Sequence, residues 1–200
     1  MMPYWRARLI QLNNTTVGNA LAFNGFWAFA CIGQDAALPF TIAALVILVL
    51  ATPDLGKTSL LAARVATIGL LVDIVLTRSE IFVFSNHAFV PMWLALLWFG
   101  FSTTLVRSLK FLNRHLLLAA LFGAIGGPSS YFAGHRFGAV EFGYELIPTL
   151  LLLAVIWACL LPLFFTLARQ LYNEDLTEVS AYPSSVMVPT AFCFSESYEC

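Results

Sequence analysis

The sequence predicts an all-α, polytopic membrane protein with about six transmembrane helices and with both termini in the cytoplasm. The first observation behind this prediction is composition. Of the 200 residues, 60% are hydrophobic and only 10% are charged, whereas a soluble domain carries about 25% charged residues. The second observation is a series of long apolar runs. A chain with so few charges cannot cover itself with a polar surface, so lipid must be the solvent for much of it.

The predicted spans are apolar runs close to the length that crosses the roughly 30 Å of bilayer hydrocarbon. The first two are short and are separated only by residues 33–35, so we expect them to form a tight helical hairpin. The third contains Arg64 and Asp73, and the last contains Pro162, which predicts a kink. The six expected spans are residues 17–32, 36–51, 59–76, 89–106, 116–133 and 147–168.

Basic residues indicate the orientation, because they stay preferentially on the cytoplasmic side. With the N-terminus inside, only Arg78 and Arg136 fall outside, and Arg64 lies near the inner face. The opposite orientation inverts this ratio. With the N-terminus inside, the residues on the cytoplasmic side are Arg6, Arg8, Lys57, Arg107, Lys110, Arg114 and Arg169.

Two flanking segments complete the expected domain organisation around the six-helix domain of residues 17–170. Residues 1–16 resemble an amphipathic interfacial lead-in with Tyr4 and Trp5 at the interface, or else an unstructured basic start. We expect no cleavable signal peptide there. Residues 171–200 are polar, acidic and rich in serine, which predicts a mostly disordered cytoplasmic tail.

Several chemistries find no support in the motifs. The stretch ATPDLGKT at residues 51–58 ends like a phosphate-binding loop, but a predicted membrane helix precedes it where the motif needs a strand, so we interpret it as a turn. The three histidines form no repeated boxes and the four cysteines have no metal-ligand spacing, so we expect no metal and no cofactor. A net charge of −1 without a basic block predicts no nucleic-acid partner.

The glycine-rich stretch GAIGGPSSYFAGHRFGAVEF, residues 123–142, is the most unusual part of the chain. Small residues four apart allow helices to approach closely in lipid, and Pro128 frees the carbonyl group of Ala124. We therefore expect a central fifth helix that is kinked or broken at Gly127-Pro128, or else a packing device without a ligand. The two small-residue ridges are Ala119, Gly123 and Gly127, and Gly126, Ser130, Gly134 and Gly138.

Asp73 is the second feature that bears on function. Inserting a carboxylate near the middle of a membrane costs about 2.5–3.5 kcal/mol on insertion scales. We expect Asp73 to be buried and hydrogen-bonded, and we expect the third and fourth spans, which carry Asp73 and Thr103-Thr104, to be the close neighbours of the fifth. Asp73 could belong to a polar cavity open to the periplasm, or simply bond to an adjacent helix. By the predicted topology, Asp73 lies in the periplasmic half of the membrane domain. The other polar residues placed in that half are Arg78, Glu80, His87, Tyr131, His135, Arg136, Glu141 and Glu145.

From this set we select candidate site residues. The candidate ligand-binding residues are Asp73, Thr103, Thr104, Tyr131 and Arg136. The candidate catalytic residues are Asp73, Glu141 and His135, since acid–base work needs titratable groups near the substrate. We expect Arg136 to pair with Glu141 or, next, with Glu80.

Four segments together resemble the bacterial inner-membrane family catalogued as domain of unknown function 2878. They are residues 19–31, 69–76, 91–112 and 123–142, and the likeness extends over about residues 19–168. Members often have Asn-His after Thr-Thr-Leu, where this chain has Val106-Arg107. The resemblance implies a small polytopic protein of the inner membrane. Members are often encoded near genes for fatty-acid modification and stress response, which implies a connection with membrane lipid.

Three functions fit these observations. The first is an accessory protein that binds membrane lipid, another membrane protein or a second copy of itself through its glycine ridges. The second is a membrane-embedded enzyme that acts on lipid, with His135 and Arg136 holding a head group. The third is a small solute transporter, with a broken fifth helix forming its site.

Overall fold

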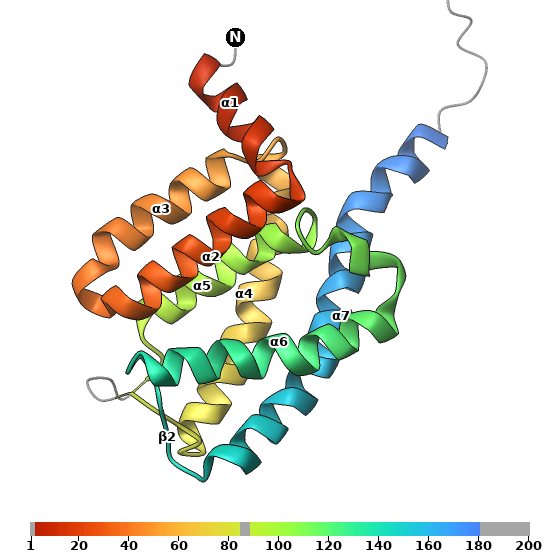
Figure 1. Cartoon of the computed structure of the whole chain (residues 1–200). Coiled ribbons are helices and arrows are strands. Elements are labelled where there is room, and N and C mark those ends of the chain that lie inside the picture. The colour runs from red at the N-terminus through yellow and green to blue at the C-terminus, as the bar shows by residue number, and fades with distance from the viewer. Residues whose placement is uncertain (1–2, 85–88, 181–200) are drawn as a thin grey trace, which may run out of the picture.

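The computed structural model describes residues 3–84 and 89–180, with side chains up to residue 172, and it is mostly helical (Figure 1). The elements in order are α1 (Tyr4–Asn13), α2 (Thr16–Gly33), η1 (Gln34–Ala37), α3 (Leu38–Leu50), α4 (Leu55–Arg78), β1 (Phe82–Val83), α5 (Met92–Leu105), η2 (Lys110–Arg114), α6 (Leu116–Arg136), β2 (Glu141–Phe142) and α7 (Leu146–Ser180).

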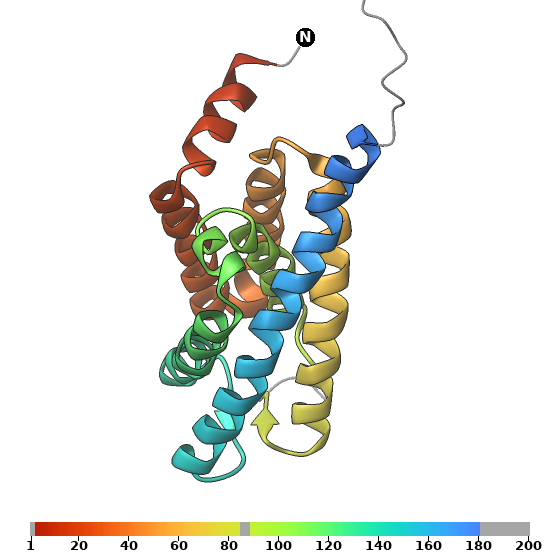
Figure 2. The same ribbon diagram turned by 90° about the vertical axis from the view of Figure 1, so that its right-hand side faces the viewer.

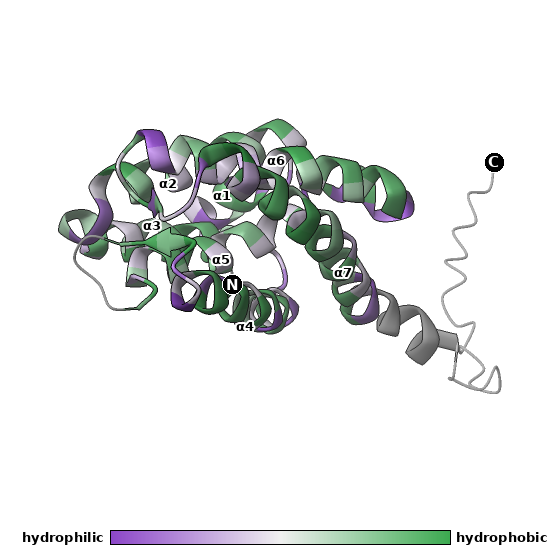
Figure 3. Ribbon diagram, turned by 90° about the horizontal axis from the view of Figure 1, so that it is seen from below, coloured by the Kyte–Doolittle hydropathy of each residue, from purple (hydrophilic) through white to green (hydrophobic). Residues whose placement is uncertain are grey.

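Within the described residues, 4 helical segments are long and apolar enough to cross a membrane: Thr16–Leu50, Leu55–Arg78, Leu116–Arg136 and Leu146–Tyr172. Hydrophobic residues dominate the helices (Figure 3), and many large apolar side chains point outward, such as Leu117 and Ile125. A soluble monomer rarely exposes so much contiguous apolar surface. These features are those of a membrane protein.

The first two expected spans form the predicted hairpin. Helix α2 ends where Gln34 takes a φ of 43°, and α3 then runs back antiparallel beside it (Figure 1). Helix α3 has 13 residues and α5 has 14, which gives each a length of only about 20 Å. The fourth expected span, residues 89–106, is therefore shorter than predicted, because α5 begins at Met92 and ends at Leu105.

The sequence predicts a kink or a break in the fifth span at Gly127-Pro128. The break is wrong, because α6 is helical from Leu116 to Arg136 with Pro128 inside it, and the kink stays a prediction. A proline deprives the helix of only one N–H donor, which neighbouring packing can offset. Helix α6 also packs mainly against α7 rather than against α4 and α5. A Cβ atom on Gly127 would overlap the Trp157 ring of α7, and one on Gly123 would overlap the Trp157 carbonyl oxygen.

A short antiparallel pair of strands closes one end of the helix bundle. Phe82 of β1 pairs with Phe142 of β2, and Val83 pairs with Glu141. Helix α6 ends before β2 with a left-handed Gly138, φ 72°. The Gly138 N–H donates to the carbonyl of His135, and the Ala139 N–H donates to that of Gly134. This is the Schellman arrangement, in which glycine favours a sharp helix end.

The opposite end holds the N-terminal helix and the end of α7 (Figures 1 and 2). The side chains of Arg6 and Asn13 in α1 donate to the carbonyl oxygens of Leu50 and Ala51, at 3.2 and 3.1 Å. Helices α4 and α7 lie side by side in the bundle (Figure 2). Helix α7 continues to Ser180, so residues 171–180 of the predicted tail are helical. Residues 181–200 lie outside the described residues, so their disorder stays a prediction.

Candidate functional site

Asp73 lies in the protein interior and accepts hydrogen bonds from two other helices. Its exposed fraction is 0%. The indole Nε1 of Trp98 in α5 donates to Oδ2 at 2.6 Å, and the hydroxyl of Tyr131 in α6 donates to Oδ1 at 2.7 Å. The prediction that Asp73 is buried and hydrogen-bonded is confirmed. Its partners join α4, α5 and α6 at one point.

Aromatic packing fixes both of these donors. The Trp98 ring stacks on Trp157 with centroids 5.3 Å apart, and the Tyr131 ring stacks on Phe82 at 4.8 Å. On the α4 side, a Cβ on Gly69 would overlap the Trp98 ring. Rings held on two sides keep their polar atoms aimed at one acceptor. Asp73 and these four rings, with Gly69, form a rigid unit that we call the Asp73 cluster.

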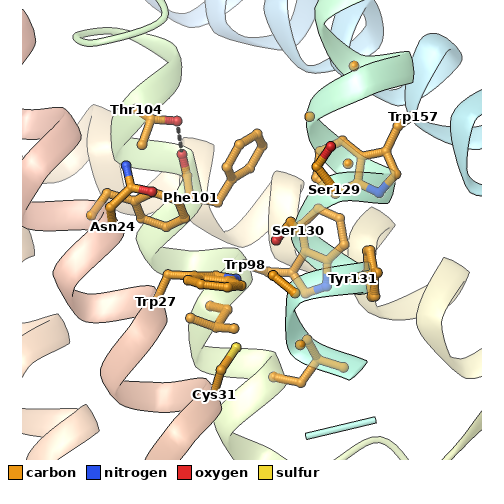
Figure 4. Close-up of a pocket in the computed structure, with 18 of the residues that line it drawn as sticks. Asn24, Trp27, Cys31, Trp98, Phe101, Thr104, Ser129, Ser130, Tyr131 and Trp157 are labelled. Carbon is orange, nitrogen blue, oxygen red and sulfur yellow. Dashed lines mark hydrogen bonds between the residues drawn. The ribbon is translucent and has the colours of Figure 1, made fainter. Parts of the chain in front are cut away.

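Next to the Asp73 cluster, a groove with a volume of about 630 Å³ runs between α2, α5, α6 and α7. Figure 4 shows Asn24, Trp27 and Cys31 of α2 facing Ser129, Ser130 and Tyr131 of α6, with Trp98, Phe101 and Thr104 of α5 between them. Most of its lining is apolar or aromatic. Asp73 is behind the wall, because Trp98 and Tyr131 line the groove and it does not.

The two small-residue ridges of α6 have different surroundings. Ala119, Gly123 and Gly127 are buried, and the two glycines take the close contact with α7. Gly126, Ser130 and Gly134 of the second ridge line the groove, and Gly123 and Gly127 also reach it beside Trp157. A Cβ on Gly126 would meet nothing within 4 Å. Its missing side chain therefore leaves the groove open rather than allowing a helix to approach.

The other predicted ligand-binding residues are dispersed. The Thr104 hydroxyl donates to the carbonyl of Phe101 at 2.7 Å, and Thr104 lines the groove. Thr103 is buried, donates to the carbonyl of Gly100 at 2.8 Å, and does not line it. Arg136 is exposed at the end of α6. Of the two possibilities left open for Asp73, the described residues show hydrogen bonds to neighbouring helices and no single polar cavity that gathers these side chains around it.

The candidate catalytic residues do not gather around Asp73 either. His135 Nδ1 lies 3.0 Å from the carbonyl oxygen of Val140, and its ring stacks on Phe142. Glu141 and Glu80 are exposed, and the described residues provide no ion pair for Arg136, so the predicted Arg136–Glu141 pair is not formed. His87 lies outside the described residues. In the part that is described, no three His, Cys, Asp or Glu side chains could hold a metal ion.

A second buried polar network, centred on Asn19, was not predicted from the sequence. Asn19 of α2 has an exposed fraction of 0%. Its Nδ2 donates to Asn13 Oδ1 at 2.9 Å, and its Oδ1 accepts from the Ser108 hydroxyl at 2.7 Å and from the Ser108 N–H at 3.3 Å. These bonds fix the turn after α5 that carries Arg107. The available signal was an asparagine in an apolar run, which burial makes expensive unless it is paired.

Comparison with known proteins gives one family. The family described as "Protein of unknown function (DUF2878)" matches residues 16–163. No curated protein and no solved structure matches the chain. The resemblance found in the sequence is therefore confirmed, over a stretch that contains the Asp73 cluster and the whole groove.

Proposed function

Because the chain belongs to the DUF2878 family, whose function is unknown, we propose its role from the geometry of the site. It is a multi-pass protein of the bacterial inner membrane that binds membrane lipid in the groove between α2, α5, α6 and α7. Together with the lipid connection that the family resemblance implies, such binding favours an accessory role in membrane-lipid homeostasis or stress response. The observation that carries the proposal is the apolar, aromatic lining of that groove.

The size and lining of the groove suit one acyl chain with a weakly polar end. A volume of about 630 Å³ lies within the range of ligand pockets, about 300–1,000 Å³. Trp27, Phe101 and Trp157 offer apolar surface, and the Ser130 hydroxyl offers a hydrogen bond. The Ser129 hydroxyl donates to a backbone carbonyl oxygen of α6 at 2.6 Å and can still accept. Burying methylene groups against such rings contributes about 0.8 kcal/mol for each group removed from water. In a membrane, lipid acyl chains are the molecules most readily available to fill an open apolar groove.

The orientation with both termini inside belongs to the same proposal. Arg78 and Arg136 end the two helices that lead to β1 and β2. At the opposite end, Arg6 donates to the carbonyl of Leu50, and Arg107, Lys110 and Arg169 share one cavity. Basic residues favour the cytoplasmic side. This supports placing the α1 end inside and the strand end outside.

The enzyme alternative keeps one supporting observation. Tyr131 lines the groove and donates to Asp73, so a proton could pass between a bound lipid and Asp73 through the phenol. Asp73 would then act only through Tyr131. Lipid profiles of a deletion strain under stress test this second candidate, because an unchanged profile would count against it. The transporter alternative loses its premise, since it relied on a broken fifth helix.

The groove can be tested by filling it. Gly126→Leu places a side chain in open space that faces the groove, so we expect the helix to fold and lipid binding to fall about tenfold or more. Gly25→Leu is the matched control, because a Cβ there also meets nothing within 4 Å and Gly25 does not line the groove. Crosslinking to a phospholipid with a photoreactive acyl chain, followed by peptide mapping, measures occupancy.

The same experiment separates other occupants. Equal labelling of the two leucine variants and the wild type would reject the proposal. Loss of a dimer or of a captured membrane protein in Gly126→Leu, with lipid labelling unchanged, would assign the groove to a partner helix or to a second copy of the chain.

A further inference from the structure

A second cavity lies at the α1 end of the helix bundle, between the start of α4, the turn after α5 and the end of α7. Its volume is about 390 Å³. Three basic residues line it: Arg107 from the turn after α5, Lys110 from the start of η2, and Arg169 from α7. We call it the basic cavity. It shares no lining residue with the apolar groove.

Arg107 is the unusual member, because it is buried without a carboxylate partner among the described residues. Its exposed fraction is 9%. Its Nε donates to Asn14 Oδ1 at 3.4 Å and its Nη1 donates to the Thr103 carbonyl oxygen at 3.3 Å, and both acceptors are neutral. Burial lowers the pKa of Arg107, because leaving water disfavours the charged form. An uncompensated buried cation is costly, so an anion nearby would stabilise it.

The described lining of the basic cavity forms no ion pair with this charge. Asp54 is the acidic residue on its wall; its Oδ1 caps α4 by accepting the Lys57 N–H at 3.0 Å, and its single negative charge is outnumbered by the three basic side chains. Arg169 donates to Asn113 Oδ1 at 2.8 Å. The hydroxyl groups of Thr58 and Tyr172 lie 3.4 Å apart and add neutral donors to the wall. In the described part of the chain none of the three basic side chains forms an ion pair.

We propose that the basic cavity binds a phosphate group, carried by an anionic phospholipid head group or present as free phosphate. Three cations with additional hydroxyl donors match an anion with several oxygen atoms, and arginine binds phosphate through paired N–H donors. The cavity lies at the end of the bundle that carries most of the basic residues. The inference goes beyond the proposed groove and does not depend on what occupies that groove.

The test uses the full-length protein in nanodiscs and in detergent. The first arm is native mass spectrometry after exchange into phosphatidylcholine with or without phosphatidylglycerol. The second arm is calorimetric titration of inorganic phosphate into lipid-free, detergent-solubilised protein. In at least one arm we expect wild-type protein to bind one anion and R107Q to bind it about tenfold or more weakly. Binding only in the first arm identifies a head group, and binding in the second identifies free phosphate.

Two further variants keep the test decisive. Lys110 is exposed, so K110Q is expected to fold even if R107Q does not, and it should weaken binding about threefold or more. R114Q is the matched control, because Arg114 is exposed and lies outside the cavity. Equal losses in K110Q and R114Q would indicate non-specific attraction and would overturn the proposal, as would the absence of binding in both arms.

The acidic residues that follow Tyr172 in the sequence supply the strongest rival. Neutralising them in an E174Q/D175N variant should leave anion binding within about twofold of wild type. If anions bind only after this change, the chain's own acidic segment serves as the counter-ion of the basic cavity, and the proposal fails.

Discussion

Among the described residues, two side chains with a carboxyl or a basic group are buried, Asp73 and Arg107, and their surroundings differ. Asp73 accepts from two ring donors at 2.6 and 2.7 Å, and both rings are held by stacking. Arg107 meets two neutral acceptors at 3.4 and 3.3 Å and opens onto a cavity with two further cations. The protein completes the coordination of one charge and leaves that of the other incomplete.

This difference suggests different roles for the two residues. A buried polar group whose partners are all supplied by the protein stabilises one packing arrangement. A buried charge with incomplete partners is costly by itself, and a ligand can offset that cost. Asp73 therefore stabilises the packing of the groove wall, whereas Arg107 has the role of binding an anion in our proposal. Removing each residue should then have different consequences for stability.

The largest effect on stability is expected for Asp73→Ala. This change leaves the Trp98 indole and the Tyr131 hydroxyl without an acceptor inside the protein, at a cost of about 1–3 kcal/mol for each donor. Asp73→Asn should cost less, because the amide oxygen still accepts one bond. Thermal unfolding in detergent measures both variants, with Glu141→Gln on the exposed strand as the control. An Asp73→Ala protein as stable as the control would remove the structural role from Asp73.

A smaller loss is expected for Tyr131→Phe. It removes one hydrogen bond but keeps the ring that stacks on Phe82 at 4.8 Å, so the unfolding free energy should fall by about 1 kcal/mol. Tyr144→Phe is the matched control, since Tyr144 is exposed. Combined with Asp73→Ala, Tyr131→Phe should add almost nothing, because the acceptor is already gone. Additive losses would show that the Tyr131 hydroxyl contributes to stability independently of Asp73.

The sequence predicted the burial of Asp73 but not its partners. Burial follows from one residue, because a carboxylate in hydrocarbon is costly wherever it occurs. The partners lie 25 and 58 residues away, and one sequence gives no measure of distance between helices. The same reason hid the basic cavity, whose lining comes from residues near 54, 107 and 169.

The wrong predictions came from treating local signals as decisive. Pro128 indicated a kink or a break in the fifth span. Gly123 and Gly127 of the same helix pack closely against Trp157, and this packing holds α6 along α7. The outer-half polar residues suggested one shared cavity. Arg136 and Glu141 instead lie at the ends of their elements, where they are exposed. Polar residues that lie at the same depth in the membrane therefore need not belong to the same site.

The smallest change in intrinsic stability is expected for Arg107→Gln, and it sharpens the comparison most. Because the guanidinium lacks a carboxylate partner among the described residues, losing its charge should alter the unfolding free energy by less than about 1 kcal/mol in phosphate-free, neutral detergent. Wild-type protein should gain about 1.4 kcal/mol when a phosphate-bearing anion is present at ten times its dissociation constant, because only the folded state binds it. Asp73→Asn should keep this gain and Arg107→Gln should lose it. If Arg107→Gln instead unfolds as readily as Asp73→Ala without any anion, then Arg107 is a structural residue like Asp73, and the contrast between the two buried charges fails.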